Sequence, residues 1–326
     1  MPIHNIVFSG AEIRGISYIG IIKAIEELNI NDNIKNILGV SSGAIFATTL
    51  VLGLSSSQLE KIIMSLSIGQ LFNFSTDNIL NIVDTYGIDD GEKITRIFKI
   101  LFKKILKNEH ATFKDLHEFN SSKNLVISGT NLYTKKSEFF SYQTTPDMPL
   151  YIAIRISTSI PICFNAVNYN NSMYIDGAFS NNFPINYFKE DIKNTLGIII
   201  SEVKTTNKEI NTLGDYMYTI TDCVLGIMPN YLKHLYNNNI IEIEVEYNVL
   251  ELKFNSVIKK HLVYSGYAQF LEKYKLLFGD EISTDTVKSE NPSSNEKVEE
   301  IIEDMNKEIK VMNEETKIIA RDRNNF

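Results

Sequence analysis

Short apolar runs alternate along the chain with longer segments in which apolar residues recur every three or four positions. Runs of the first kind are typical of buried strands, and segments of the second kind are typical of amphipathic helices. The predicted strands are residues 3–8, 37–40, 124–129, 138–142, 162–167, 173–175, 196–201 and 241–246. The predicted helices are residues 15–28, 42–52, 55–66, 90–106, 213–236 and 256–278. Because strands that alternate with helices form parallel sheets covered on both faces, the pattern predicts a three-layer α/β/α sandwich with a mostly parallel central sheet.

The pattern changes after residue 279, so residues 1–279 are expected to form the main domain. Residues 280–295 are rich in acidic and small polar side chains, which cannot bury enough apolar surface to fold, and they predict a linker. In residues 296–326 apolar side chains return at spacings of four and three, which predicts an amphipathic C-terminal helix. Its apolar stripe consists of Val298, Ile302, Met305, Ile309, Met312, Thr316 and Ile319.

This C-terminal stripe leaves three interpretations open. It could dock on the main domain, pair two copies of the chain in a homo-oligomer through residues 298–319, or remain a solvated and partly frayed helix. Because about three heptads are marginal for a stable coiled coil, the sequence does not choose between docking and pairing.

Composition narrows the class of protein. The chain has 326 residues, of which 44% are hydrophobic and 10% aromatic, enough for a sizeable core. Most of the net charge of −8 lies after residue 278, where 13 acidic residues face 7 basic ones and give −6. No basic stripe with interleaved aromatic residues is present, so no nucleic-acid partner is expected. Cys163 and Cys223 form neither a disulfide framework nor a metal-ligand spacing, which favours a reducing compartment.

Two segments bear on the location of the protein. The first residues lack the basic start, apolar core and cleavage site of a secretory signal and already resemble a strand. Residues 37–54 are uncharged and apolar enough to resemble a membrane span, but they include Gly39, Ser41, Ser42 and Gly43. A buried strand followed by a buried helix explains them better. We therefore expect an intracellular protein, cytoplasmic or bound peripherally to a membrane, without signal peptide or transmembrane helix.

A G-x-S-x-G motif, Gly39-Val40-Ser41-Ser42-Gly43, lies between a predicted strand and a predicted helix. In such a strand-turn-helix the serine has a strained backbone and its hydroxyl projects from the end of the sheet. The glycines are needed because a side chain at either position would collide with the neighbouring strand or helix. Ser41 is therefore the predicted nucleophile, and the amide of Ser42 begins a helix that favours negative charge.

The base that would activate Ser41 has two candidates. Asp176 ends a predicted strand and is followed by Gly177, so its carboxylate could act directly on Ser41 once burial raises its pKa. Alternatively, the order Ser, Asp, His suits an α/β-hydrolase triad completed by His234 or His261. That fold places several strands before its nucleophile, whereas at most one strand precedes the nucleophile strand here.

Residues 8–15 form a glycine-bearing loop between the first predicted strand and the first predicted helix. Backbone N–H groups in such a loop can bind an oxyanion. The loop lacks Gly-Lys-Ser/Thr, and Glu12 breaks a G-x-G-x-x-G pattern, so a nucleotide site is not expected.

Together these three segments resemble the patatin-like phospholipase family. That family carries a glycine-rich oxyanion loop, a G-x-S-x-G nucleophile and a D-G-G/A aspartate, and it uses a Ser-Asp dyad without histidine. The matching residues are Gly10, Arg14 and Gly15, then Gly39, Ser41 and Gly43, then Asp176, Gly177 and Ala178. The resemblance covers about residues 3–200, and we see no such match after residue 200.

The resemblance implies a function for the main domain. It would be a lipid acyl hydrolase, of phospholipase A or lysophospholipase type, that cleaves fatty acyl esters through an acyl-Ser41 intermediate. Asp176 would deprotonate Ser41 and then a water. The oxyanion would be held by backbone N–H groups of Gly10, Ala11, Glu12 and Ser42. No metal or organic cofactor is implied, and the expected partner is a phospholipid or other acyl lipid at a membrane surface.

Ala11 and Glu12 depart from the family's loop, where both positions are glycine. A left-handed Ala11 would cost about 1 kcal/mol in strain. A Glu12 carboxylate within ~5 Å of the oxyanion would cost roughly 3 kcal/mol at an effective dielectric of about 20, or about a hundredfold in rate. The alternative to an enzyme is therefore a degenerate patatin-like domain that binds a lipid or a partner and has little hydrolase activity.

Residues 92–107 predict a basic amphipathic helix, with one apolar stripe and one stripe of Arg96, Lys99, Lys103 and Lys107. Such a helix usually packs its apolar face on a core. It can also act as a lid or membrane-contact helix that is attracted to anionic headgroups.

Overall fold

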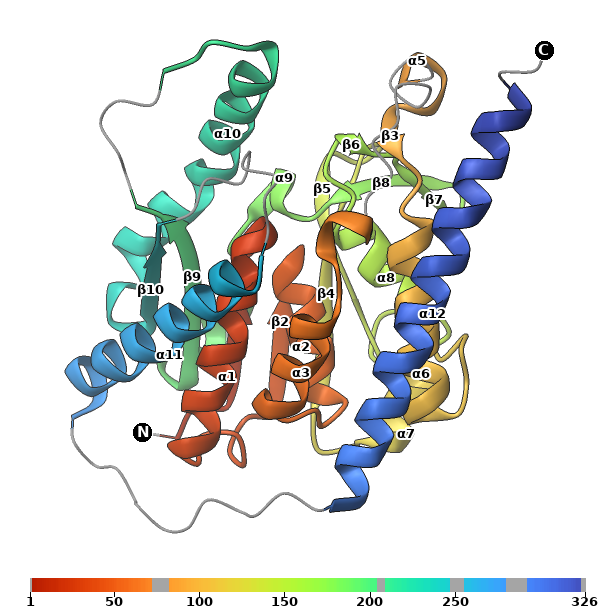
Figure 1. Ribbon diagram of the computed structural model, residues 1–326. Coiled ribbons are helices and arrows are strands. Elements are labelled where there is room, and N and C mark those ends of the chain that lie inside the picture. Colours follow the sequence, from red (N-terminus) through yellow and green to blue (C-terminus); the bar gives the residue numbers. More distant parts are fainter. Residues whose placement is uncertain (1, 72–81, 204–208, 247–254, 280–291, 324–326) are drawn as a thin grey trace.

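The computed structural model describes residues 2–71, 82–203, 209–246, 255–279 and 292–323 (Figure 1). The strands are β1 (Asn5–Phe8), β2 (Asn36–Gly39), β3 (Gly87–Asp89), β4 (Asn124–Asn131), β5 (Lys136–Ser141), β6 (Ile162–Phe164), β7 (Val167–Tyr169), β8 (Ser172–Asp176), β9 (Thr195–Glu202) and β10 (Ile240–Val245). The α-helices are α1 (Ser17–Glu27), α2 (Ser42–Val51), α3 (Ser56–Ser65), α5 (Ile82–Thr85), α6 (Glu92–Leu106), α7 (Phe113–Phe119), α8 (Leu150–Ser157), α9 (Ala178–Asn181), α10 (Leu213–Leu235), α11 (Ser256–Phe278) and α12 (Pro292–Arg323). Short 3-10 helices are η1 (Glu12–Ile16), η2 (Ile68–Leu71), η3 (Ile185–Asn194) and η4 (Asn237–Asn239).

The main sheet has the strand order β10-β9-β1-β2-β4-β8-β7, with β5 also paired to β4. Strands β10, β9, β1, β2 and β4 run parallel to one another, whereas β5, β8 and β7 add antiparallel pairs. This confirms the predicted mixed α/β fold with a mostly parallel sheet. The carboxyl ends of β1 and β2 meet at one edge, because Phe8 lies opposite Gly39 in the register.

Alternating side chains of the central strands enter two separate cores, one on each face of the sheet. Ile6 and Ile37 belong to the larger core, which includes residues of α1, α2 and α11. Val7 and Leu38 belong to the smaller core, which includes residues of α9, η3 and α10. The period of two along the strands therefore produces the three layers that the sequence predicted.

Helices α1 and α11 cross at close range through two glycines. A Cβ on Gly20 would lie 1.9 Å from the backbone oxygen of Val263, and one on Gly266 would lie 2.1 Å from that of Ser17. The backbones of the two helices thus pack directly on each other.

Several predicted boundaries were wrong in detail. The predicted helix 15–28 begins as the 3-10 turn η1 before α1. The predicted strand 162–167 is divided into β6 and β7, because β6 pairs with β3 in a separate two-stranded sheet. Helix α12 begins at Pro292, four residues before its predicted start, since proline suits the first turn of a helix.

Helix α12 docks on the body of its own chain, along α6 (Figure 1). The buried residues of its inner face are Val298, Ile301, Met305, Ile309 and Met312. Arg96 of α6 pairs with Glu308 and Glu315 of α12. Thr316 and Ile319 have side chains outside the described part of the structure. The stripe that could have paired two copies is thus largely covered within one chain.

Helix α6 also packs on the core rather than standing free. Ile97, Phe98, Leu101 and Ile105 are buried. Of its basic residues, Lys104 lies against Glu300 and Asp304 of α12. Of the two interpretations of this helix, core packing is the one that the structure supports.

Among the described residues, no helix has both the length and the apolar character that crossing a membrane requires.

Candidate active site

Ser41 occupies the sharp turn between β2 and α2. Its backbone has φ 53° and ψ −127°, in the left-handed half of conformational space that non-glycine residues rarely adopt. The N–H of Ser41 donates a hydrogen bond of 2.9 Å to Ser157 Oγ on α8. Strain of this kind persists only where the surroundings fix it, and it is common at catalytic positions.

The two glycines of the motif have the steric role that the sequence analysis assigned to them. A Cβ on Gly39 would lie 2.4 Å from the backbone oxygen of Gly43. A Cβ on Gly43 would lie 2.5 Å from the backbone oxygens of both Phe8 and Ser9. Because all these atoms are backbone, no side-chain rotation could make room, and the turn requires glycine on both sides of Ser41.

Asp176 lies at the end of β8 and points at Ser41. Ser41 Oγ donates to Asp176 Oδ2 at 2.7 Å, although the two residues are 135 positions apart in the sequence. Asp176 Oδ1 accepts a second hydrogen bond, of 2.9 Å, from the N–H of Ala178. The structure thus brings together the two halves of the predicted dyad, with only β4 between their strands.

Burial changes the acidity of this carboxyl group. Asp176 is completely buried, and the loss of hydration raises its pKa to about 7. The hydrogen bonds from Ala178 and Ser41 lower the pKa, and the nearby negative charge of Glu12 raises it. A base with a pKa near the working pH combines a useful ionised fraction with a useful affinity for the proton.

In the candidate oxyanion loop, residues 10–12, the residue with a left-handed backbone is Glu12 and not Ala11, as the sequence had led us to expect. Ala11 has an ordinary φ of −147°, whereas Glu12 has φ 53°. The Gly10 N–H donates to the backbone oxygen of Asn182 at 3.2 Å, and the Ala11 N–H donates to Ser42 Oγ at 3.1 Å. These contacts fix the loop so that the left-handed residue falls one position later than expected.

Of the four predicted oxyanion donors, the amides of Glu12 and Ser42 lie at the starts of helices. Glu12 is the first residue of η1, and Ser42 is the first residue of α2. The first N–H groups of a helix have no acceptor within it and carry partial positive charge. The predicted donors at Gly10 and Ala11 already have acceptors in the protein.

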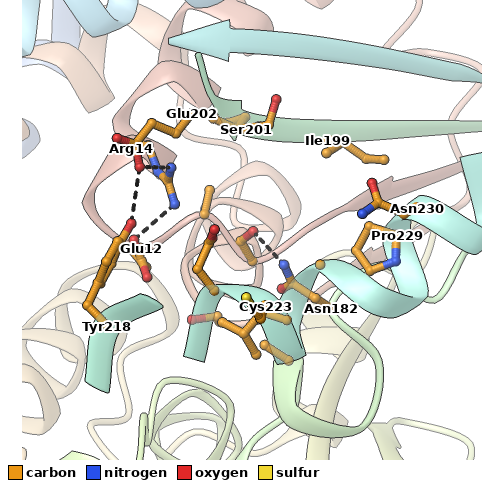
Figure 2. Close-up of a pocket in the computed structure, with 18 of the residues that line it drawn as sticks. Glu12, Arg14, Asn182, Ile199, Ser201, Glu202, Tyr218, Cys223, Pro229 and Asn230 are labelled. Atoms are coloured by element: carbon orange, nitrogen blue, oxygen red, sulfur yellow. Dashed lines mark hydrogen bonds and ion pairs between the residues drawn. The ribbon is translucent and has the colours of Figure 1, made fainter. Parts of the chain in front are cut away.

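The Glu12 carboxylate neither points freely to solvent nor stands alone (Figure 2). Glu12 pairs with Arg14 Nη2 at 3.0 Å, and Arg14 Nη1 lies 3.4 Å from Glu202. The Tyr218 hydroxyl donates to the same Glu202 carboxylate at 3.3 Å. Burial raises the pKa of Glu12 despite the opposing effect of Arg14. Arg14 therefore forms an ion pair with Glu12, the residue that replaces a glycine of the family's loop. The motif match of Arg14 did not predict this contact.

These residues line a cavity of about 680 Å³ that contains Ser41 and Asp176. One wall comes from α10, which contributes residues such as Tyr218, Cys223, Pro229 and Asn230 (Figure 2). Another comes from the end of β9, with Ile199, Ser201 and Glu202. The α10 wall was not predicted from the sequence, because no local motif marks a helix that reaches the site only through the fold.

The histidines of the alternative triad lie elsewhere. His234 and His261 are exposed, and neither is among the described residues that line the cavity. Within the described ranges, no group of three or more His, Cys, Asp or Glu side chains is placed to hold a metal ion.

Comparison with known proteins agrees with the geometry. The family model Patatin-like phospholipase matches residues 6–189. An uncharacterised protein of Acanthamoeba polyphaga mimivirus is 28% identical over 272 residues, which are 79% of this chain and 88% of that protein. A probable lipid hydrolase of Invertebrate iridescent virus 6 is 31% identical over 184 residues, 56% of this chain and 61% of that protein. Among solved structures, VipD from Legionella pneumophila has a TM-score of 0.60 at 17% identity, and the match covers 100% of this chain and 77% of that one. The segment that matches the family model contains both Ser41 and Asp176.

Proposed function

Because the chain belongs to the patatin-like phospholipase family, we propose that it hydrolyses fatty acyl esters of lipids through a dyad of Ser41 and Asp176. The observation that carries this proposal is the 2.7 Å hydrogen bond from Ser41 Oγ to a fully buried carboxylate. The distance lies within the range needed for direct proton transfer, so a histidine between the two residues is unnecessary.

The reaction would follow two steps, acylation of Ser41 and hydrolysis of the acyl-Ser41 ester. In the first, Asp176 takes the proton of Ser41 as Oγ attacks the acyl carbonyl, and the protonated Asp176 then gives that proton to the departing alcohol. In the second, a water loses a proton to Asp176 and attacks the acyl-Ser41 ester. The collapsing intermediate releases the fatty acid, and the proton returns to Ser41.

The oxyanion of each tetrahedral intermediate would be held by the amides of Glu12 and Ser42. Both begin helices, and Glu12 and Ser41 line the same cavity. Donors that are already oriented stabilise the developing charge without reorganisation, and each is worth about 3 kcal/mol in comparable sites.

The substrate would be a phospholipid, a lysophospholipid or a related acyl lipid. A cavity of about 680 Å³ is within the range of sites that hold ligands of this size. Its lining includes apolar residues such as Ile160, Phe179 and Leu225, which suit an acyl chain.

The first test is fatty-acid release from mixed phospholipid vesicles in a buffer without divalent metal. Wild type should release fatty acid, and Ser41→Ala and Asp176→Asn should each reduce the rate by about a thousandfold or more. His234→Ala and His261→Ala serve as matched controls and should retain the wild-type rate. Loss of activity in either histidine variant would replace the dyad by a triad.

One observation favours a second candidate, a patatin-like domain that binds lipid with little turnover. The amides of Gly10 and Ala11 are already bonded within the protein, and a carboxylate follows them at Glu12. Vesicle binding without fatty-acid release by wild type would support this candidate.

A further inference from the structure

Helix α10 presents an exposed row of large apolar side chains that the proposed catalysis does not use. The row consists of Leu213, Tyr216, Ile220, Val224, Ile227, Tyr231 and Leu235. Leu213 is 76% exposed and Ile227 is 63% exposed, whereas the buried residues of the helix are Pro229 and Leu232. In Figure 1 the first half of α10 extends beyond the sheet, away from the body of the molecule.

The row keeps to one side of α10, whose second half contains Pro229. Its members are separated by three, four and four positions, twice in succession, so the pattern repeats every 11 residues. An 11-residue repeat corresponds to 3.67 residues per turn, close to the 3.6 of an undistorted helix. A left-handed coiled coil needs a repeat of seven instead. The row therefore does not fit a left-handed coiled coil of two copies, and it fits a flat surface. Because an 11-residue repeat also suits a right-handed supercoil, pairing of two copies is one of the outcomes tested below.

The exposed row contains no Asp, Glu, Lys or Arg, and the exposed His234 lies beside its last members, Tyr231 and Leu235. The charged residues of α10 are Asp215, Asp222 and Lys233, and none belongs to the row. Asp215 caps the start of the helix by bonding to Thr212, and Lys233 pairs with Glu242. Asp222 lines the cavity of Ser41. Charged side chains resist removal from water, so their absence from this face removes the main obstacle to insertion into an apolar phase.

The opposite side of the same helix lines the catalytic cavity. Tyr218, Leu225 and Pro229 contribute to the cavity wall, and no member of the exposed row does. Helix α10 thus has the Ser41 cavity on one side and the exposed apolar row on the other. An acyl lipid in a bilayer beside α10 would therefore lie about one helix diameter, roughly 10 Å, from the wall of the pocket.

We propose that α10 inserts its exposed apolar row into the surface of a lipid bilayer and thereby places the mouth of the Ser41 cavity over the lipid. The consequence for turnover rests on the proposed function, whereas the insertion itself does not. Tyrosines at two positions of the row suit this location, since their rings are apolar and their hydroxyls can remain hydrated at the headgroup level. Helix α6, the contact helix considered from the sequence, has its apolar face buried and two of its basic residues paired with α12.

A single tryptophan can report on this insertion, because the chain has none of its own. In a Ser41→Ala background, Ile227→Trp is compared with Leu276→Trp on α11, where Leu276 is 79% exposed. On addition of phosphatidylcholine vesicles, the emission of Ile227→Trp should move to shorter wavelength and be quenched by lipids brominated on their acyl chains. Leu276→Trp should show neither change. An Ile227→Trp signal that vesicles leave unaltered would overturn the proposal.

A second pair of variants measures the affinity. The double variant Ile220→Glu with Ile227→Glu should bind vesicles about a hundredfold more weakly in a flotation assay, since removing each isoleucine from the lipid lowers the affinity about tenfold. Val257→Glu with Leu276→Glu adds the same charges at exposed positions of α11 and should leave flotation unchanged. Equal loss in both pairs would overturn the assignment to α10. Circular dichroism and thermal melts check that all the variants are folded.

Three further outcomes show whether a second copy of the chain covers the row and whether the insertion and the proposed function stand or fail separately. If wild type is a dimer by light scattering and the α10 glutamates make it a monomer without changing flotation, a second copy covers the row and the proposal fails. If vesicles shift the Ile227→Trp emission but wild type releases no fatty acid, the insertion stands and the proposed function fails. If vesicle hydrolysis is unaffected by the α10 glutamates, the function stands and the insertion fails.

Discussion

Burial makes the ionised form of Asp176 unfavourable and thereby suits this residue to its proposed role as a base. Its carboxylate has two hydrogen-bond donors, from Ser41 and Ala178, yet burial still raises its pKa to about 7. The same desolvation that supplies basicity makes the ionised form costly in the folded state.

The first consequence concerns the pH dependence of activity. Because Asp176 must be ionised to accept the Ser41 proton, kcat/KM on an uncharged, monomeric ester should rise about tenfold per pH unit below 7 and level off above it. Glu12→Gln should move this midpoint to lower pH, since the Glu12 charge helps to raise the Asp176 pKa. A profile that is flat between pH 5 and 8 would contradict the assignment of Asp176 as base.

The second consequence concerns stability. Between the ordinary carboxyl pKa of about 3.9 and the folded value of about 7, the folded protein holds a proton on Asp176 that the unfolded chain has lost. The free energy of unfolding therefore falls as the pH rises through this window. Asp176→Asn removes that dependence, so its stability relative to wild type should increase by about 3 kcal/mol between pH 5 and pH 8. Urea unfolding at the two pH values measures the difference, and a constant difference would refute it.

Glu12 is the residue at which a substitution should improve the enzyme. Glycine would relieve the left-handed backbone, worth about 1 kcal/mol, and would remove a negative charge beside the oxyanion. Because Arg14 partly neutralises that charge, we expect Glu12→Gly to raise kcat/KM by about tenfold rather than the full hundredfold of an unpaired carboxylate. Glu12→Gln removes the same charge and should give a similar gain, whereas only Glu12→Gly should also raise the free energy of unfolding, by about 1 kcal/mol. No gain in either variant would show that the Glu12 carboxylate does not affect the transition state.

At the scale of elements, α12 is held mainly by its buried stripe. Met305 and Ile309 are almost fully buried against the body, whereas the acidic partners of Arg96 are partly exposed. Exposed ion pairs contribute about 1 kcal/mol at most, and buried methionines contribute about 2 to 5.

This difference predicts the result of two matched truncations. Met305→Ala should lower the free energy of unfolding by about 2 to 3 kcal/mol, because it leaves a cavity between α12 and the body. Arg96→Ala should lower it by less than about 1 kcal/mol, and that effect should vanish in high salt. Denaturant unfolding of both variants measures this contrast, and the reverse ranking would mean that charge rather than packing docks α12.

At the scale of the whole molecule, periodicity predicted the layers, and the motifs predicted that Ser41 and Asp176 lie together. Apolar residues alternate along β1 and β2 because both faces of the sheet are covered, and this pattern is visible in the sequence. The sequence could predict Ser41 and Asp176 because Ser41 lies in the turn after one strand, Asp176 is the last residue of another, and each is followed by a glycine or a small residue.

The features that could not be predicted from the sequence depend on contacts between distant segments. The left-handed residue of the oxyanion loop is Glu12 rather than Ala11, because Asn182 and Ser42 fix the preceding amides. The strand predicted at 162–167 is divided because β3, about 75 residues earlier, pairs with only part of it. The wall that α10 gives to the cavity has no local signal in the sequence, because the helix reaches the site only through the fold and most of its large apolar residues lie on the outer surface.

The distance along the chain between Ser41 and Asp176 has a consequence for biosynthesis. During translation the nucleophile leaves the ribosome first, and its base follows only after another 135 residues. Strand β1, which lies between β9 and β2 in the sheet, has no partner on one side until β9 has also been made. A nascent chain therefore carries a serine without its activating carboxylate. If the two residues form the proposed dyad, hydrolysis by this site would begin only after most of the protein has been synthesised.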